Sequence, residues 1–196
     1  MRAVVALLAP IRWAPPGIDL AAFRTALAED VVDLLATLAE VEPAIAVTAA
    51  DRPLAAAVAW PGMRVYELSR PTVREALAAA AGDGHEQAAV LVPDAPDLPG
   101  LVVGKLLQPL TTRSVAAAPT LDGPGLLGLA SRLPAPGWLP AVDLDATAPQ
   151  DVRAAAPQPA EVAVTPGWHR VRGPADLYRL DPALEGWEAT RALLGG

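Results

Sequence analysis

The chain has 196 residues, of which 53% are hydrophobic, a formal net charge of −7 at pH 7 and no cysteine. Without cysteine, disulfides, thiolate catalysis and cysteine-ligated zinc are excluded. The acidic balance argues against a nucleic-acid partner, because nucleic-acid binders usually carry a basic face. The length suits one domain with a sizeable core.

The chain begins with an apolar segment, residues 1–9, that contains a single basic residue. A weak signal peptide and a buried first strand both suit this segment. Pro10, Arg12 and Trp13 interrupt any longer apolar region, which favours the strand. No apolar run approaches the roughly 20 residues that span a bilayer. We therefore expect a cytoplasmic protein without a membrane partner.

Segments of two kinds alternate between residues 1 and 130. Short apolar runs are typical of strands buried on both faces, and they occur at 4–8, 44–48, 88–92 and 115–118. A further strand is predicted at 63–68, although this segment contains Arg64 and Glu67. Apolar residues at spacings of three and four predict helices, at 20–39, 52–60, 72–81 and 101–110. This alternation predicts a three-layer α/β/α architecture with right-handed crossovers.

After about residue 130 the sequence becomes rich in proline, which disfavours long regular elements. One more strand is predicted at 161–165, and short helices are predicted at 175–180 and 184–194. We therefore expect a single domain over residues 1–196, with a regular α/β core at 1–130 and an irregular part at 131–196.

Asp94 follows the apolar run 88–92, and prolines at 93, 96 and 99 forbid both a continued strand and an immediate helix. Its carboxylate is therefore expected at the carboxyl end of a central strand, the edge at which open α/β sheets bind ligands. The alternative is an aspartate that only caps a helix or forms a turn.

The densest cationic segment of the chain is 169–172, with the sequence His-Arg-Val-Arg. In an extended conformation Arg170 and Arg172 project to one side, so both guanidinium groups could bind phosphate directly. Arg12, in the first loop, would add a second phosphate contact. The alternative is a solvated edge whose arginines pair with nearby carboxylates.

A third candidate is the turn segment that contains Asp122 and Gly123. Glycine has no side chain, so a ligand can approach the backbone closely there. Equally, Asp-Gly followed by Pro-Gly is a common recipe for two consecutive turns.

Three segments resemble the glycosyltransferase-A-like nucleotidyl and glycosyl transferases, in particular a bacterial branch related to molybdenum-cofactor and phospholactate guanylyltransferases. Residues 91–98 are similar to a strand followed by Asp-x-Pro-x-Leu. Residues 121–129 are similar to Asp-Gly-Gly-Tyr-Tyr-Leu-x-Gly-Leu, and residues 173–177 to the end of Asp-Val-Asp-Thr-Pro-Glu-Asp-Leu. The resemblance covers nearly the whole chain in order and spacing.

The resemblance implies a Rossmann-like α/β/α domain with a mixed, mostly parallel sheet that binds a nucleotide or nucleotide sugar at its carboxyl edge. Asp94 would hold Mg²⁺ or Mn²⁺. The residues expected to contact the nucleotide or its phosphates are Arg12, Gly17, Asp122, Gly123, Arg170 and Arg172.

The chain departs from the family pattern at two places. The first loop lacks the family's Lys-Thr-Arg, and the aspartates of Asp-Val-Asp fall on Arg170 and Arg172. Guanidinium groups in place of carboxylates remove oxygen ligands and repel a divalent cation, which argues against metal-dependent transfer. In a competing alignment, residues 142–152 match the aspartate-rich motif, and Asp143 or Asp145 supplies the second metal ligand.

Three functions follow from this pattern. The first is a metal-dependent nucleotidyl or glycosyl transferase. The second is a non-catalytic module that binds an anionic ligand or a protein partner, and the third is a transferase that uses Arg170 and Arg172 instead of a metal. An apolar face on the C-terminal helix would also allow a homodimer.

Overall fold

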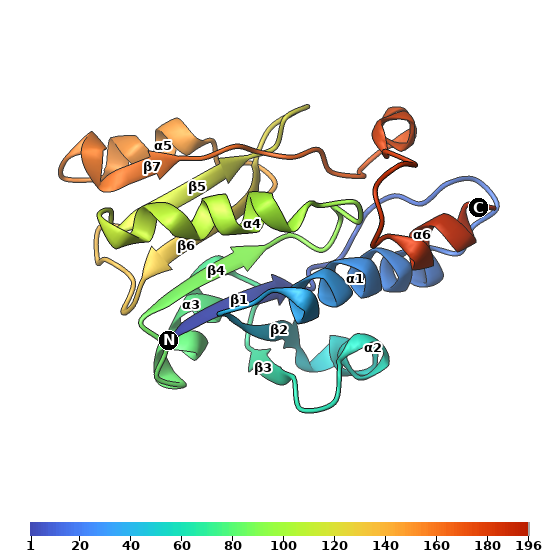
Figure 1. Ribbon diagram of the computed structural model, residues 1–196, viewed down its shortest axis with the longest axis horizontal. Coiled ribbons are helices and arrows are strands. Elements are labelled where there is room, and N and C mark those ends of the chain that lie inside the picture. The colour runs from blue at the N-terminus through green and yellow to red at the C-terminus, as the bar shows by residue number, and fades with distance from the viewer. Residues whose placement is uncertain (196) are drawn as a thin grey trace.

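The computed structural model describes residues 1–195, which form one seven-stranded sheet of order β3-β2-β1-β4-β6-β5-β7 (Figure 1). The first four strands run parallel to one another, β6 runs antiparallel to β4 and β5, and β7 runs parallel to β5. The strands are β1 (Arg2–Leu7), β2 (Glu42–Thr48), β3 (Arg64–Leu68), β4 (Gln87–Leu91), β5 (Val115–Pro119), β6 (Leu126–Arg132) and β7 (Val162–Val164).

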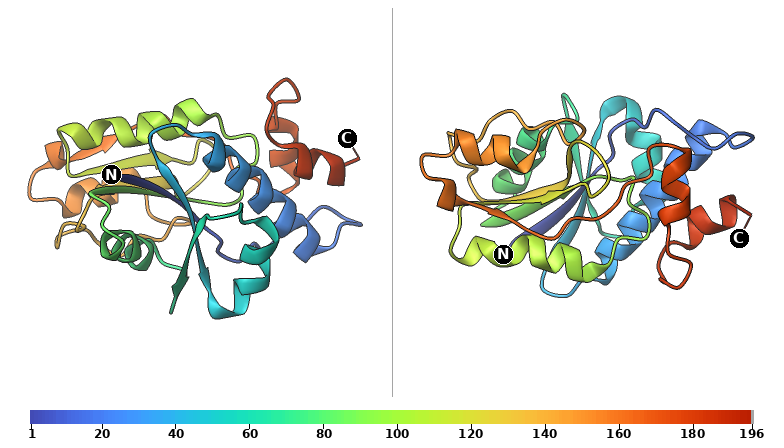
Figure 2. Two further views of the ribbon diagram at one scale, coloured as in Figure 1. Left: turned by 60° about the horizontal axis from the view of Figure 1, so that its bottom comes forward. Right: turned by 90° about the horizontal axis from the view of Figure 1, so that it is seen from above.

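Helices cover both faces of this sheet: α1 and α4 lie on one face, and α3 and α5 on the other (Figure 2). The α-helices are α1 (Leu20–Thr37), α2 (Arg52–Val58), α3 (Val73–Gly82), α4 (Gly100–Leu107), α5 (Pro149–Ala155) and α6 (Glu188–Leu193). The 3₁₀ helices are η1 (Ala49–Asp51), η2 (Gln108–Thr111), η3 (Pro159–Glu161) and η4 (Pro174–Arg179). The predicted three-layer α/β fold with a mixed, mostly parallel sheet is confirmed.

The central strands are buried on both faces, as their unbroken apolar sequences predicted. Ala3–Ala6 of β1 and Ala88–Leu91 of β4 have no solvent exposure. Alanine and valine dominate both runs, so helices pack against each face with little intervening side-chain volume. Within the described residues no helix is both long and apolar enough to cross a bilayer.

Two elements were absent from the sequence prediction. β6 directly follows the predicted turn around Asp122 and Gly123, in residues for which no element was predicted, and it separates β4 from β5 in the sheet. α5 lies in the proline-rich part, and Pro149 occupies its first turn. Proline is tolerated there because backbone N–H groups in the first turn make no hydrogen bond within the helix.

Two predicted helices near the C-terminus are shorter or tighter than expected. The helix predicted at 184–194 forms only at Glu188–Leu193, after Gly186 with a positive φ of 94°. The helix predicted at 175–180 is the 3₁₀ segment η4.

The C-terminal segment returns to the first helix, where α6 packs beside α1 (Figure 1). The carboxylate of Asp30, on α1, accepts hydrogen bonds from the backbone N–H groups of Ala189 and Thr190, each at 2.9 Å. A second hydrophobic core joins the same parts of the chain, and its buried members are Phe23, Leu27, Val171, Leu180 and Trp187. These contacts place the segment around residue 171 against α1.

The buried carboxyl of Asp30 makes a testable contribution to the pH dependence of stability. Burial raises its pKa from 3.8 to about 6. The folded chain therefore binds this proton more tightly, so the stability that Asp30 contributes is full below pH 3.8 and is lost as pH rises through about 6. Asp30→Asn, which mimics the protonated form, should gain stability relative to wild type across that window. Urea unfolding of both proteins across it measures this difference, and a pH-independent difference would contradict the assignment.

Candidate functional site

A cleft of about 710 Å³ opens at the carboxyl edge of the sheet. Because β1, β3 and β4 are parallel, the residues that follow them reach the same edge. The cleft is lined by residues from five segments, within 7–13, 70–73, 92–94, 141–145 and 170–172. Sequence regions that are far apart in the chain therefore meet at one site.

The floor of the cleft is a buried ion pair between Asp94 and Arg170. The side chain of Arg170 donates from Nε to Asp94 Oδ1 at 2.7 Å and from Nη2 to Asp94 Oδ2 at 2.8 Å. The two residues are only 4% and 6% exposed. The backbone N–H of Val171 also donates to the carbonyl of Asp94 at 2.7 Å, which fixes the register between the two segments.

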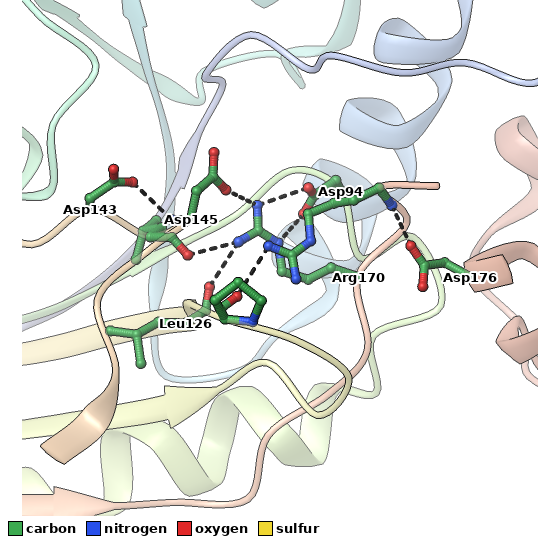
Figure 3. A network of polar contacts seen from close by, with 9 residues as sticks. Asp94, Leu126, Asp143, Asp145, Arg170 and Asp176 are labelled. Atoms are coloured by element: carbon green, nitrogen blue, oxygen red, sulfur yellow. Dashed lines mark hydrogen bonds and ion pairs between the residues drawn. The ribbon is translucent and has the colours of Figure 1, made fainter. Parts of the chain in front are cut away.

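The remaining donors of Arg170 are also occupied (Figure 3). Nη1 donates to the carbonyls of Leu144 at 2.8 Å and Leu126 at 3.3 Å, and Nη2 donates to Asp145 Oδ1 at 2.7 Å. A guanidinium has five N–H donors, so these three bonds and the two to Asp94 use all of them. Although burial opposes the charged form, the charges of Asp94 and Asp145 raise the pKa of Arg170 above its ordinary value. Arg170 is thus a fixed cation.

The loop that carries Asp145 is held against the start of β6 by a glycine. Gly125 has a φ of 94°, and a Cβ at this position would lie 2.3 Å from the carbonyl oxygen of Leu144. Asp143 Oδ1 accepts the backbone N–H of Asp145 at 2.9 Å and closes the turn. This packing aims the Asp145 carboxylate at the guanidinium of Arg170.

Three further arginines, Arg12, Arg70 and Arg172, line the cleft. Arg12 is exposed, Arg70 meets Glu75 only at 3.5 Å, and Arg172 uses Nη1 to donate to the carbonyl of Pro124 at 3.1 Å. Guanidinium donors on all three therefore remain for a ligand. With Arg170, the cleft holds four arginines against three aspartates, a formal charge of +1 in a chain of −7.

The amino end of α3 faces the same cleft through Thr72 and Val73. Thr72 caps this helix, because its hydroxyl accepts the backbone N–H of Glu75 at 3.2 Å. A helix amino terminus carries a partial positive charge. The amino end of α3 therefore adds to the positive electrostatic potential that the arginines create in the cleft.

The segment 168–172 is anchored from behind by Asp97, which is 2% exposed. Its carboxylate accepts hydrogen bonds from Trp168 Nε1 at 3.1 Å and from the backbone N–H of Asp181 at 3.2 Å, and it pairs with His169 Nε2 at 2.9 Å. His169 thus turns to Asp97 while Arg170 turns to Asp94.

The structure brings six of the residues singled out in the sequence to the cleft, and leaves three outside its lining. The six are Arg12, Asp94, Asp143, Asp145, Arg170 and Arg172. The three are Gly17, Asp122 and Gly123. The carboxylate of Asp122 pairs with Arg179 instead, while a Cβ on Gly123 would lie 3.0 Å from Nη2 of Arg172.

The two competing alignments of the aspartate-rich motif lead to neighbouring residues. Asp145 comes from one alignment and Arg170 from the other, and their side chains are hydrogen-bonded.

Two residues that line the cleft, Arg70 and Thr72, were not predicted as site residues from the sequence. Both follow β3 at the carboxyl edge, so the strand-end rule that identified Asp94 would have identified them too.

Mg²⁺ or Mn²⁺ does not fit the carboxylates of this cleft. Both oxygens of Asp94 and one oxygen of Asp145 are engaged by Arg170. A divalent ion between the two carboxylates would have to displace the guanidinium and face its positive charge. Among residues 1–195 there is no group of three or more acidic or histidine side chains placed to hold a metal ion.

Removal of Asp94 would leave a buried guanidinium without its main partner. We expect Asp94→Ala to lower the free energy of unfolding by about 3–5 kcal/mol. The control is Asp122→Ala, which breaks the ion pair with Arg179. This pair is more exposed than that of Asp94 and Arg170, so the free energy of unfolding should change little. Chemical denaturation measures both values. Equally small losses would show that the pair with Asp94 does not hold Arg170 in place.

No protein-family model and no curated protein matches the chain, but solved structures do. A protein designated a nucleotide-diphospho-sugar transferase, from Desulfovibrio desulfuricans G20, is 20% identical, with a TM-score of 0.62 over 99% of this chain and 96% of that one. The 4-diphosphocytidyl-2C-methyl-D-erythritol synthase of Anaerococcus prevotii is 10% identical, with a TM-score of 0.59 over 98% and 95%.

A third similar structure is glucosyl-3-phosphoglycerate synthase from Mycobacterium tuberculosis in complex with Mg²⁺ and UDP. It is 15% identical, with a TM-score of 0.56 over 98% of this chain and 77% of that one. The sequence identities are low throughout, so the likeness is one of fold. The chain thus has the glycosyltransferase-A-like fold seen in these transferase structures, with little sequence identity to them.

Proposed function

We propose that the cleft binds a nucleoside diphosphate or a nucleotide sugar, with the phosphates against Arg12, Arg70 and Arg172. The observation that carries this proposal is a cationic cleft at the carboxyl edge of the sheet in an otherwise acidic chain. Guanidinium groups are the side chains best suited to phosphate oxygens, because they offer paired donors and a permanent charge.

The size and the walls of the cleft suit a ligand of this class. Small-molecule sites commonly measure about 300–1,000 Å³, and this cleft measures about 710 Å³. Leu7, Ile11 and Val142 supply apolar wall beside the arginines. Such a combination favours a ligand with one apolar, flat part and one anionic part.

Trp13 is the side chain best placed to meet a base. It lines the cleft and is held edge-on against Phe23, with ring centroids 5.9 Å apart. A half-buried indole that is fixed on one side can stack on a planar group with little further loss of side-chain entropy. UDP in the similar glucosyl-3-phosphoglycerate synthase supports a nucleotide as the class of ligand.

One observation favours a binding module over a metal-dependent transferase as the second candidate function. Asp94, the carboxylate that the family resemblance assigns to the metal, is neutralised by Arg170. Arg12, Arg70 and Arg172, here called the rim arginines, could bind a nucleotide whether or not the protein catalyses a reaction. Incubation with a nucleotide sugar, followed by chromatography of the products, distinguishes a transferase from a binding protein.

The rim arginines can be tested against an arginine at the opposite edge of the sheet. Arg70 follows β3 at the cleft, whereas Arg64 begins β3 at the other end. We expect Arg70→Ala and Arg172→Ala each to weaken UDP or GDP binding about tenfold or more, the cost of one charge-assisted contact. Arg64→Ala should leave the affinity unchanged.

Isothermal titration calorimetry measures these affinities, and added salt should weaken the wild-type interaction. Equal effects of Arg70→Ala and Arg64→Ala would contradict a phosphate site at this rim. Absence of binding to UDP, GDP, CDP and UDP-glucose would contradict the nucleotide proposal itself.

A further inference from the structure

The floor of the cleft contains a cation that belongs to the chain itself. Nη2 of Arg170 donates at the same time to Asp94 Oδ2 at 2.8 Å and to Asp145 Oδ1 at 2.7 Å. One nitrogen therefore bridges two carboxylates that come from different segments. Figure 3 shows the guanidinium of Arg170 between Asp94 and Asp145, so a divalent ion could reach both carboxylates only by displacing it.

The environment of the two carboxylates explains why a cation is needed there. The Asp94 side chain is 6% exposed, whereas the Asp145 side chain is 54% exposed. Without Arg170, a buried carboxylate would lie beside a second one at the base of a cleft that is to receive phosphates. Two carboxylates that both contact one nitrogen lie close together, and neighbouring like charges repel most strongly where they are buried.

Arg170 has no donor left for a ligand, because its five N–H groups are shared among Asp94, Asp145 and the carbonyls of Leu126 and Leu144. A direct phosphate contact, as the sequence suggested for this arginine, would require one of these bonds to break. Its effect on an anion is therefore electrostatic. The direct contacts fall to the arginines at the rim.

We propose that Arg170 takes the place of a divalent cation in this cleft, so that a nucleoside diphosphate binds here without a metal ion. Asp94 and Asp145 are then anchors for the guanidinium, and not metal ligands. This inference rests on the proposed function for its ligand, but the role of Arg170 can be tested with the metal alone.

The first experiment titrates Mn²⁺ into the protein without nucleotide and follows free Mn²⁺ by electron paramagnetic resonance. Wild type should show no saturable site up to about 1 mM, the weak end of protein sites for hard cations. Arg170→Asp removes the cation and adds a third carboxylate beside Asp94 and Asp145, so this variant should gain one saturable site.

The matched control is Arg172→Asp, which makes the same change at a position that is not between two carboxylates. It should gain no Mn²⁺ site. Thermal unfolding gives a second readout: Mn²⁺ should raise the melting temperature of Arg170→Asp by roughly 5 °C or more, and leave wild type unchanged. A Mn²⁺ site in wild type that is lost in Asp94→Asn overturns the inference. Should Arg170→Asp not fold, the wild-type titration alone decides.

The second experiment measures UDP and GDP affinity in EDTA and again in excess Mn²⁺. Affinities that agree within about twofold support the inference, whereas binding at least about tenfold tighter with Mn²⁺ overturns it. If no nucleotide binds in either buffer, the proposed function fails, and the Mn²⁺ titration still decides the role of Arg170. The two failures are thus distinguishable.

Discussion

The buried pair of Asp94 and Arg170 is the interaction on which the site depends. A guanidinium with 6% exposure is tolerated only when its charge and its hydrogen bonds are satisfied. The acceptors come from the end of β4, the start of β6 and the loop of Asp145, so the three segments must converge for Arg170 to be buried. The second hydrophobic core, which contains Val171, holds the same stretch against α1. Polar and apolar contacts therefore fix the C-terminal part over the edge of the sheet.

The architecture of the sheet and the side chains at its edge are separate features of the chain. The glycosyltransferase-A-like sheet needs buried strands and crossover helices, and the chain has them at 20% identity or less to the similar structures described above. Chemistry resides in the few side chains at the edge of the sheet. Here Arg170 occupies both oxygens of Asp94 and one oxygen of Asp145 at that edge.

The regular part of the fold was predictable because its signals are local. Apolar runs rich in alanine and valine predicted most strands, and apolar spacings of three and four predicted the helices. The structure starts α1 at a local cap, where Asp19 accepts the N–H of Ala22 at 2.9 Å. The place of β6 was not predictable, since its antiparallel pairing between β4 and β5 depends on contacts between distant parts of the sequence.

In the site, the position of Asp94 after a strand correctly predicted its place at the edge of the sheet. The donors of Arg170 are all used by acceptors that lie 25 to 76 residues away in the sequence. No sequence spacing predicts such contacts. His85, in the connection between α3 and β4, is buried, and its Nε2 meets Glu42 at 3.1 Å, another contact between residues far apart in sequence.

A crystal structure of the protein grown with UDP and MnCl₂, with anomalous data at the manganese edge, tests the central claim most directly. The account predicts that Arg170 still bridges Asp94 and Asp145, that no anomalous peak lies between these carboxylates, and that the diphosphate contacts Arg70 or Arg172. A manganese peak between Asp94 and Asp145, with the guanidinium of Arg170 turned away, would contradict it.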